Sequence, residues 1–182
     1  MGATLDPKTG AMIWEARVPL DEQPAYYRAH PPRALAAFRP TPIDHLDVRF
    51  DGHGEPINSI FALACSCGGT QFYALAHVED GELIPPIELE CTSCESPHVV
   101  FDLRVHGYTA ATGDAPSYEP SVEVEELATD ELEIIVRFEQ PSDTLGDPDN
   151  PAPAEDMFSW ISVVGRDPRT GALAILFDYE CA

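Results

Sequence analysis

The stretch IFALACSCGGTQFYALAH, residues 60–77, places two cysteines one residue apart between two apolar runs. Apolar runs on either side of a short glycine-containing turn predict two β-strands joined at a tip. Gly68 and Gly69 follow Cys67 directly, where a missing Cβ lets the chain reverse without a clash. Cys91 and Cys94 have the same setting in IELECTSCESPHVVFDL, residues 87–103. We therefore expect two cysteine-bearing turns within a β structure.

The two cysteine pairs together suit a metal ion. Zinc takes four ligands at tetrahedral angles and favours thiolates, and two turns facing each other across an ion would supply them. The pattern resembles a zinc ribbon over about 57–105, on the motifs CSCGG and CTSC, with C-x-C in the first turn where the usual spacing is C-x2-C. The resemblance implies a structural Zn²⁺ as cofactor, and its ligands would be Cys65, Cys67, Cys91 and Cys94.

Other readings of the cysteines remain open. His98, four residues after Cys94, could replace one of the four ligands, whereas Cys181 is expected to be a bystander. Free buried thiols are possible, and disulfides would require an oxidising compartment. A site closed by four cysteines has no open position for water, so it would stabilise the fold and not catalyse a reaction.

Period-two alternation dominates the rest of the chain, and 18 prolines disfavour long helices. We predict a mainly β fold with antiparallel sheets in a sandwich and an embedded zinc ribbon. One short helix is expected at 31–39, and DPRTGAL at 167–173 predicts a hairpin turn. The predicted strands are 11–18, 46–50, 57–65, 70–78, 86–91, 98–106, 120–126, 131–139, 157–164 and 172–180.

The length of 182 residues suits a single compact domain, 1–182, with the zinc-ribbon subdomain 57–105 inside it. Residues 19–43 form a Pro-rich arm, which we expect to fold back over the body. Residues 140–156 contain four prolines and five acids, and we expect an acidic mobile loop because so few apolar residues could hold it.

The net charge of −22 comes from 32 acids and 10 bases, and it lies entirely after residue 49. A field of this sign repels phosphate backbones, so we expect no nucleic-acid partner, and it attracts a basic protein. Solubility or adaptation to salt explains the same charge without any partner. The sequence contains no apolar run of membrane-spanning length and no signal-peptide pattern. We therefore expect a cytoplasmic location and no membrane attachment.

The densest acidic array is PSVEVEELATDELEIIVRFEQ, residues 120–140. Its alternation predicts a hairpin that buries one face and displays carboxylates on the other. An apolar residue amid acids would suit the centre of an interface. The predicted partner-binding residues are Glu123, Glu125, Glu131, Glu133 and Ile135.

Three functions follow from these patterns. The first is a non-enzymatic acidic zinc-binding protein that binds, and inhibits, a basic protein partner, as small immunity proteins do. The second is a zinc-ribbon accessory subunit of a larger assembly. The third is an enzyme that uses His45, with Asp44 and Asp47, or His53 as a base, although no familiar catalytic motif occurs.

Overall fold

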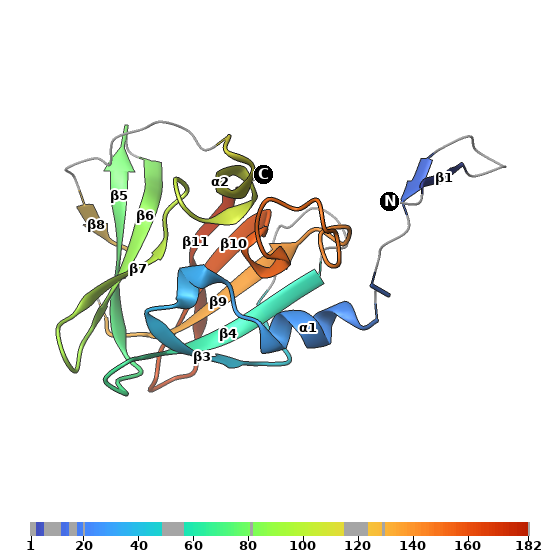
Figure 1. Cartoon of the computed structure of the whole chain (residues 1–182). Coiled ribbons are helices and arrows are strands. Elements are labelled where there is room, and N and C mark those ends of the chain that lie inside the picture. The colour runs from blue at the N-terminus through green and yellow to red at the C-terminus, as the bar shows by residue number, and fades with distance from the viewer. Residues whose placement is uncertain are drawn as a thin grey trace.

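The computed structural model describes residues 3–5, 12–14, 18–19, 21–48, 57–80, 82–114, 124–128 and 130–181. Antiparallel β-strands form three sheets, with short helices between them (Figure 1). The strands are β1 (Ala3–Leu5), β2 (Met12–Trp14), β3 (Phe38–Pro42), β4 (Ile57–Cys65), β5 (Phe72–Glu79), β6 (Glu82–Cys91), β7 (Pro97–Phe101), β8 (Val124–Glu126), β9 (Glu133–Gln140), β10 (Trp160–Arg166) and β11 (Leu173–Glu180). The helices are α1 (Gln23–Ala29), α2 (Gly107–Thr112) and the 3₁₀ turns η1 (Arg33–Leu35) and η2 (Ala154–Asp156).

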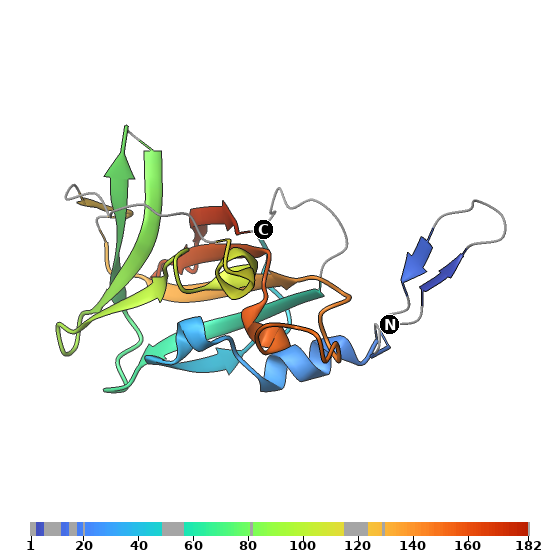
Figure 2. The same cartoon turned by 45° about the horizontal axis from the view of Figure 1, so that its top comes forward.

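The predicted mainly β fold is confirmed. The larger sheet has the strand order β11-β10-β9-β4-β3, the second has the order β7-β6-β5-β8, and β1 pairs only with β2 (Figures 1 and 2). The inner faces of the two larger sheets share one core. Its fully buried side chains include Phe61 and Phe138 from the five-stranded sheet and Phe72, Ile87 and Leu89 from the four-stranded sheet.

Strand β9 lies at the centre of the five-stranded sheet and is buried on both faces. Ile134, Val136 and Phe138 point into the shared core, whereas Ile135 packs with Leu46 and Val164 on the opposite face. The segment 43–48, which contributes Leu46, therefore covers part of the outer face of this sheet.

The Pro-rich arm 19–43 folds onto the body as expected. Tyr27 of α1 is fully buried beside Leu145 and Ala154, and its hydroxyl lies 3.1 Å from the Thr144 hydroxyl. The arm differs from the prediction in detail, because the helix expected at 31–39 is only the 3₁₀ turn η1 followed by strand β3. Pro40 and Pro42 are tolerated in β3 because it is an edge strand, paired only with β4.

The segment 140–156, expected to be a mobile loop, makes specific contacts with α1 and η1. Gln23 donates from its side-chain amide to the Ser142 carbonyl at 3.1 Å, and the Tyr26 hydroxyl donates to the Glu155 carboxylate at 2.7 Å. Composition alone did not indicate these contacts, because most of them are polar and their partners lie more than 100 residues away.

The other local predictions are partly met. Of the strand expected at 46–50, the described residues 46–48 form none, and 49–50 lie outside the described residues. The turn in DPRTGAL is confirmed: the Asp167 carboxylate accepts the backbone N–H groups of Arg169 and Thr170, at 2.7 and 3.2 Å, and Gly171 has φ +74°. Among the described residues, no helix is long and apolar enough to cross a membrane.

Candidate metal centre

The two cysteine pairs meet at the junction of the two larger sheets. Cys65 ends β4 of the five-stranded sheet, Cys91 ends β6 of the four-stranded sheet, and Cys67 and Cys94 lie in the turns that follow. The Sγ atoms of Cys65 and Cys94 are 3.7 Å apart, those of Cys67 and Cys91 are 3.6 Å apart, and all four Sγ atoms lie within 4.8 Å of one another. The predicted ligand set is therefore brought together.

Backbone hydrogen bonds shape the first turn. The Cys65 N–H donates to the Gly69 carbonyl at 2.7 Å, the Gly68 N–H donates to the Cys65 carbonyl at 2.9 Å, and the Gly69 N–H points at the Cys67 sulfur at 3.4 Å. Gly68 has φ +98°, and a Cβ on Gly69 would lie 2.8 Å from the Cys91 sulfur. Both glycines are thus required for this short turn, the first by its backbone conformation and the second by space.

The sulfur geometry fits a tetrahedral thiolate site. Zn–S bonds of about 2.3 Å at tetrahedral angles place neighbouring sulfurs about 3.8 Å apart. The two cross-turn distances of 3.7 and 3.6 Å are close to this spacing. The four-cysteine cluster could therefore hold a metal ion such as zinc.

The four thiols differ in their surroundings. Cys65 and Cys91 are fully buried, whereas Cys67 and Cys94 are exposed. A hydrogen bond from Ser96 is the main cause that lowers the pKa of Cys94 to about 6. The pKa of Cys67 is raised to about 12, because its contacts with the other thiols outweigh the lowering effect of the Gly69 N–H.

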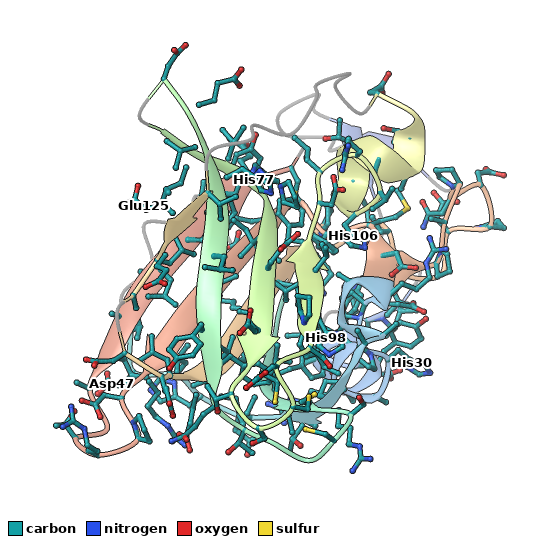
Figure 3. The ribbon with its side chains drawn as sticks, turned by 90° about the vertical axis from the view of Figure 1, so that its left-hand side faces the viewer. His30, Asp47, His77, His98, His106 and Glu125 are labelled. Atoms are coloured by element: carbon teal, nitrogen blue, oxygen red, sulfur yellow. The ribbon has the colours of Figure 1, made fainter. Side chains whose placement is uncertain are left out.

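His98, the alternative ligand, lies beside the cluster and not within it. Its Nε2 atom is 3.7 Å from the Cys65 sulfur, and its ring packs edge-on against Phe38, with ring centroids 5.5 Å apart. Figure 3 shows His98 on β7. Cys181, expected to be a bystander, is buried elsewhere, with its thiol 3.6 Å from the Phe158 carbonyl.

The resemblance to a zinc ribbon is limited to the two turns. Strand β4 pairs with β3 and β9, whereas β5, β6 and β7 belong to the other sheet. The stretch 57–105 is therefore divided between the sheets, and the cysteines join them.

The acidic hairpin expected at 120–139 is wrong. Strand β8 pairs with β5 of the four-stranded sheet, whereas β9 pairs with β4 and β10 of the five-stranded sheet. Ile135, expected at the centre of an exposed surface, is 4% exposed. Glu133 pairs with Arg166, Glu125 and Glu131 are exposed on separate segments, and Glu123 lies outside the described residues.

Of the two histidines considered for catalysis, only His45 lies within the described residues. His45 is exposed, and the neighbouring Asp44 carboxylate pairs with Arg28 at 2.5 Å. Asp47 is also exposed, and His53 lies outside the described residues. Sequence reasoning missed a different polar group, in which Arg33, His106 and Asp156 line a cavity of about 270 Å³. No short motif announces it, because its members come from three separate segments.

No protein-family model matches the chain, and comparison with curated proteins and with solved structures gives no match.

Proposed function

We propose that this chain is a non-enzymatic acidic protein, stabilised by a structural zinc ion, that binds and inhibits a basic protein partner. The observation that carries the zinc assignment is the closed set of four sulfurs where the sheets meet. Four thiolates fill the tetrahedron, so the ion has no position for a reacting water. Its role is to fasten the end of β4 to the end of β6.

The way arginines are used supports a basic partner. Six of the seven described arginines each form an ion pair with a carboxylate of the same chain; they are Arg28, Arg33, Arg104, Arg137, Arg166 and Arg169. Most arginines of the described residues are thus already engaged within the chain, and they are far fewer than the described carboxylates. A surface field of one sign speeds the encounter with a partner of opposite sign.

Two measurements test this proposal. Metal analysis of protein purified without added metal should give about one zinc per chain. Affinity capture from the native host, followed by gel filtration at about 0.15 M salt, should yield one stoichiometric basic protein. Metal-free protein with freely alkylated Cys65 and Cys91 would overturn the zinc assignment. A stoichiometric partner that is acidic, or the absence of any partner, would overturn the binding role.

The exposed turns favour a second candidate, an accessory subunit that docks through its zinc site. Cys67, Gly68, Ser93, Cys94 and Glu95 are all exposed at the tips of the two turns. Substitution of Ser93 and Glu95, which leaves the four sulfurs in place, would then abolish assembly into a larger complex. In the favoured function the same substitutions leave partner binding unchanged.

A further inference from the structure

The outer face of the four-stranded sheet is open to solvent. In β5, Ala74 and Ala76 point into the core, so the alternate residues Tyr73 and Leu75 point outward. Figure 3 views this side of the molecule, and within the part of the chain that the structure describes no helix or strand crosses in front of β5, β6 and β7. We call this surface the acidic face and define it by Tyr73, Leu75, Glu88, Glu90, Val99 and Glu126.

The strand register interleaves carboxylates with apolar side chains on the acidic face. Leu75 pairs with Glu88 on one side and with Glu126 on the other, and Glu88 pairs in turn with Val99. One row across the sheet therefore runs Val99, Glu88, Leu75, Glu126. Val99 is 39% exposed, and Val124 and Leu83 of the same sheet are 49% and 37% exposed. Apolar side chains left in water between carboxylates are typical of a surface that a partner covers.

No cation of the sheet offsets these carboxylates. Strands β5 to β8 contain six glutamates and no lysine or arginine. The Tyr73 hydroxyl donates to the Glu131 carboxylate at 3.2 Å, so an additional carboxylate lies at the edge of the face. The charge of Glu131, with smaller effects from Glu126 and Glu90, raises the pKa of Tyr73. At this edge Arg169 lines a cavity together with Tyr73 and Glu131, and its guanidinium pairs with Asp167 at 3.7 Å. The raised pKa of the phenol indicates that the local potential is still negative.

We propose that the acidic face is the surface that binds the basic partner, and that the partner presents lysine or arginine side chains with apolar residues between them. This inference rests on the proposed function. Glu88 and Glu90 are two positions apart on one strand, so their carboxylates lie on the same face about 7 Å apart. Lysine or arginine side chains at a similar spacing on the partner would complement them. The exposed Val99 and the half-buried Leu75 select the apolar residues. A lysine-rich but wholly polar partner would leave these side chains uncovered.

Two synthetic decapeptides test the proposal on the zinc-loaded protein. One alternates lysine with leucine, and the other alternates lysine with serine at the same charge. NMR titration should show tighter binding of the lysine–leucine peptide, with shifts at Tyr73, Leu75, Glu88, Glu90 and Val99. A triple variant, Glu88→Gln, Glu90→Gln and Glu126→Gln, should bind this peptide about tenfold more weakly, since exposed charge pairs each contribute modestly.

A matched control removes the same charge elsewhere. Asp21, Asp143 and Asp149 are exposed and lie outside the four-stranded sheet, so Asp21→Asn, Asp143→Asn and Asp149→Asn should change the affinity by less than about twofold. Equal losses in both triple variants would overturn the acidic face while leaving a basic partner possible. Equal affinity for the two peptides would overturn the apolar part of the inference. If neither peptide binds, the proposed function fails together with its surface.

Discussion

The outer faces of the two larger sheets differ in how charged side chains are buried and paired. In the five-stranded sheet, Arg137 and Glu139 of β9 are 7% and 4% exposed and form an ion pair, and Arg137 also lies 3.4 Å from the Ser162 hydroxyl. In the four-stranded sheet, Glu88 and Glu90 of β6 face water with no lysine or arginine on the neighbouring strands. Buried charge requires a partner within the chain, whereas exposed charge can be left for a partner outside it.

The largest expected effect on stability comes from removing a cysteine of the cluster that joins the two sheets. Cys91→Ser removes one of four ligands and should lower the free energy of unfolding by several kcal/mol, because structural zinc sites bind with about 10 kcal/mol or more. Hydrogen exchange should accelerate most in β5, β6 and β7. The strands β9 and β10 should keep slower exchange, since neither carries a cysteine of the cluster and each has a strand on both sides. Thermal unfolding with and without a zinc chelator measures the loss.

Cys181→Ser provides the control for this variant. Cys181 is equally buried but lies outside the cluster, so its substitution should leave the zinc content unchanged and cost about 1 kcal/mol. If Cys91→Ser and Cys181→Ser destabilise the chain equally and neither changes the metal content, the four sulfurs do not hold a structural ion.

The second prediction compares the effect on stability of removing one carboxylate from each sheet. Glu139→Gln removes the carboxylate that pairs with the buried Arg137 and should cost about 3 kcal/mol. Glu90→Gln changes a half-buried carboxylate on the acidic face and should alter stability by less than about 0.5 kcal/mol. Urea unfolding measures both.

A double variant sharpens this comparison. Arg137→Met with Glu139→Leu removes both buried charges and should recover most of the stability lost in Glu139→Gln. If Glu139→Gln costs no more than Glu90→Gln, the two sheets do not differ in how they hold charge.

The sequence was sufficient for the fold class and for the four-cysteine cluster because both depend on local patterns. The strand predicted at 57–65 matches β4 (Ile57–Cys65), and short turns around Cys67 and Cys94 follow from glycines and spacing. The pairing of the strands was not local. Residues 120–140 alternate as a hairpin would, but β8 and β9 join different sheets.

The same limit explains why the hairpin predicted at 120–139 was wrong. The sequence alternates Ile134, Val136 and Phe138 with Glu133, Ile135 and Arg137. This pattern predicted that one face of the strand is buried and the other is exposed to solvent. The covering segment 43–48 and the pairing of Glu133 with Arg166 cannot be inferred from β9 alone. The register, conversely, is what places Tyr73, Leu75 and Val99 on the outer face of the four-stranded sheet.

The third prediction concerns His106, which packs beside the four-stranded sheet. Its Nδ1 atom accepts the Asp102 N–H at 3.0 Å, and burial lowers its pKa, although Asp102 and Asp156 oppose this effect. The folded state therefore disfavours the protonated ring. As pH falls below about 6.5, the unfolded chain binds the proton first, and folding stability decreases.

His106→Asn keeps a hydrogen-bond acceptor near the Asp102 N–H and removes the titrating ring. Between pH 7.5 and 5, the wild type should lose more stability than this variant, because only the wild type has a buried ring whose pKa the fold lowers. Protonation of the cysteine thiolates at low pH affects both proteins alike, so the difference between them isolates His106. Parallel stability curves for the two proteins would show that the ring is not held neutral by the fold.

The smallest expected effect tests the acidic face on the isolated protein. If its carboxylates repel one another, Glu88→Gln with Glu90→Gln and Glu126→Gln should stabilise the fold. Full charges about 7–10 Å apart in water repel by about 0.5 kcal/mol, so the gain in unfolding free energy should be about that size. It should be present at about 0.01 M salt and vanish at about 1 M, where the screening length falls from about 30 Å to about 3 Å. The control triple Asp21→Asn, Asp143→Asn and Asp149→Asn should gain less, because these exposed acids lie in loops and not side by side on one sheet. An equal gain in both variants would mean that the net charge alone is responsible, and the outer faces of the two sheets would then differ in burial but not in electrostatic strain.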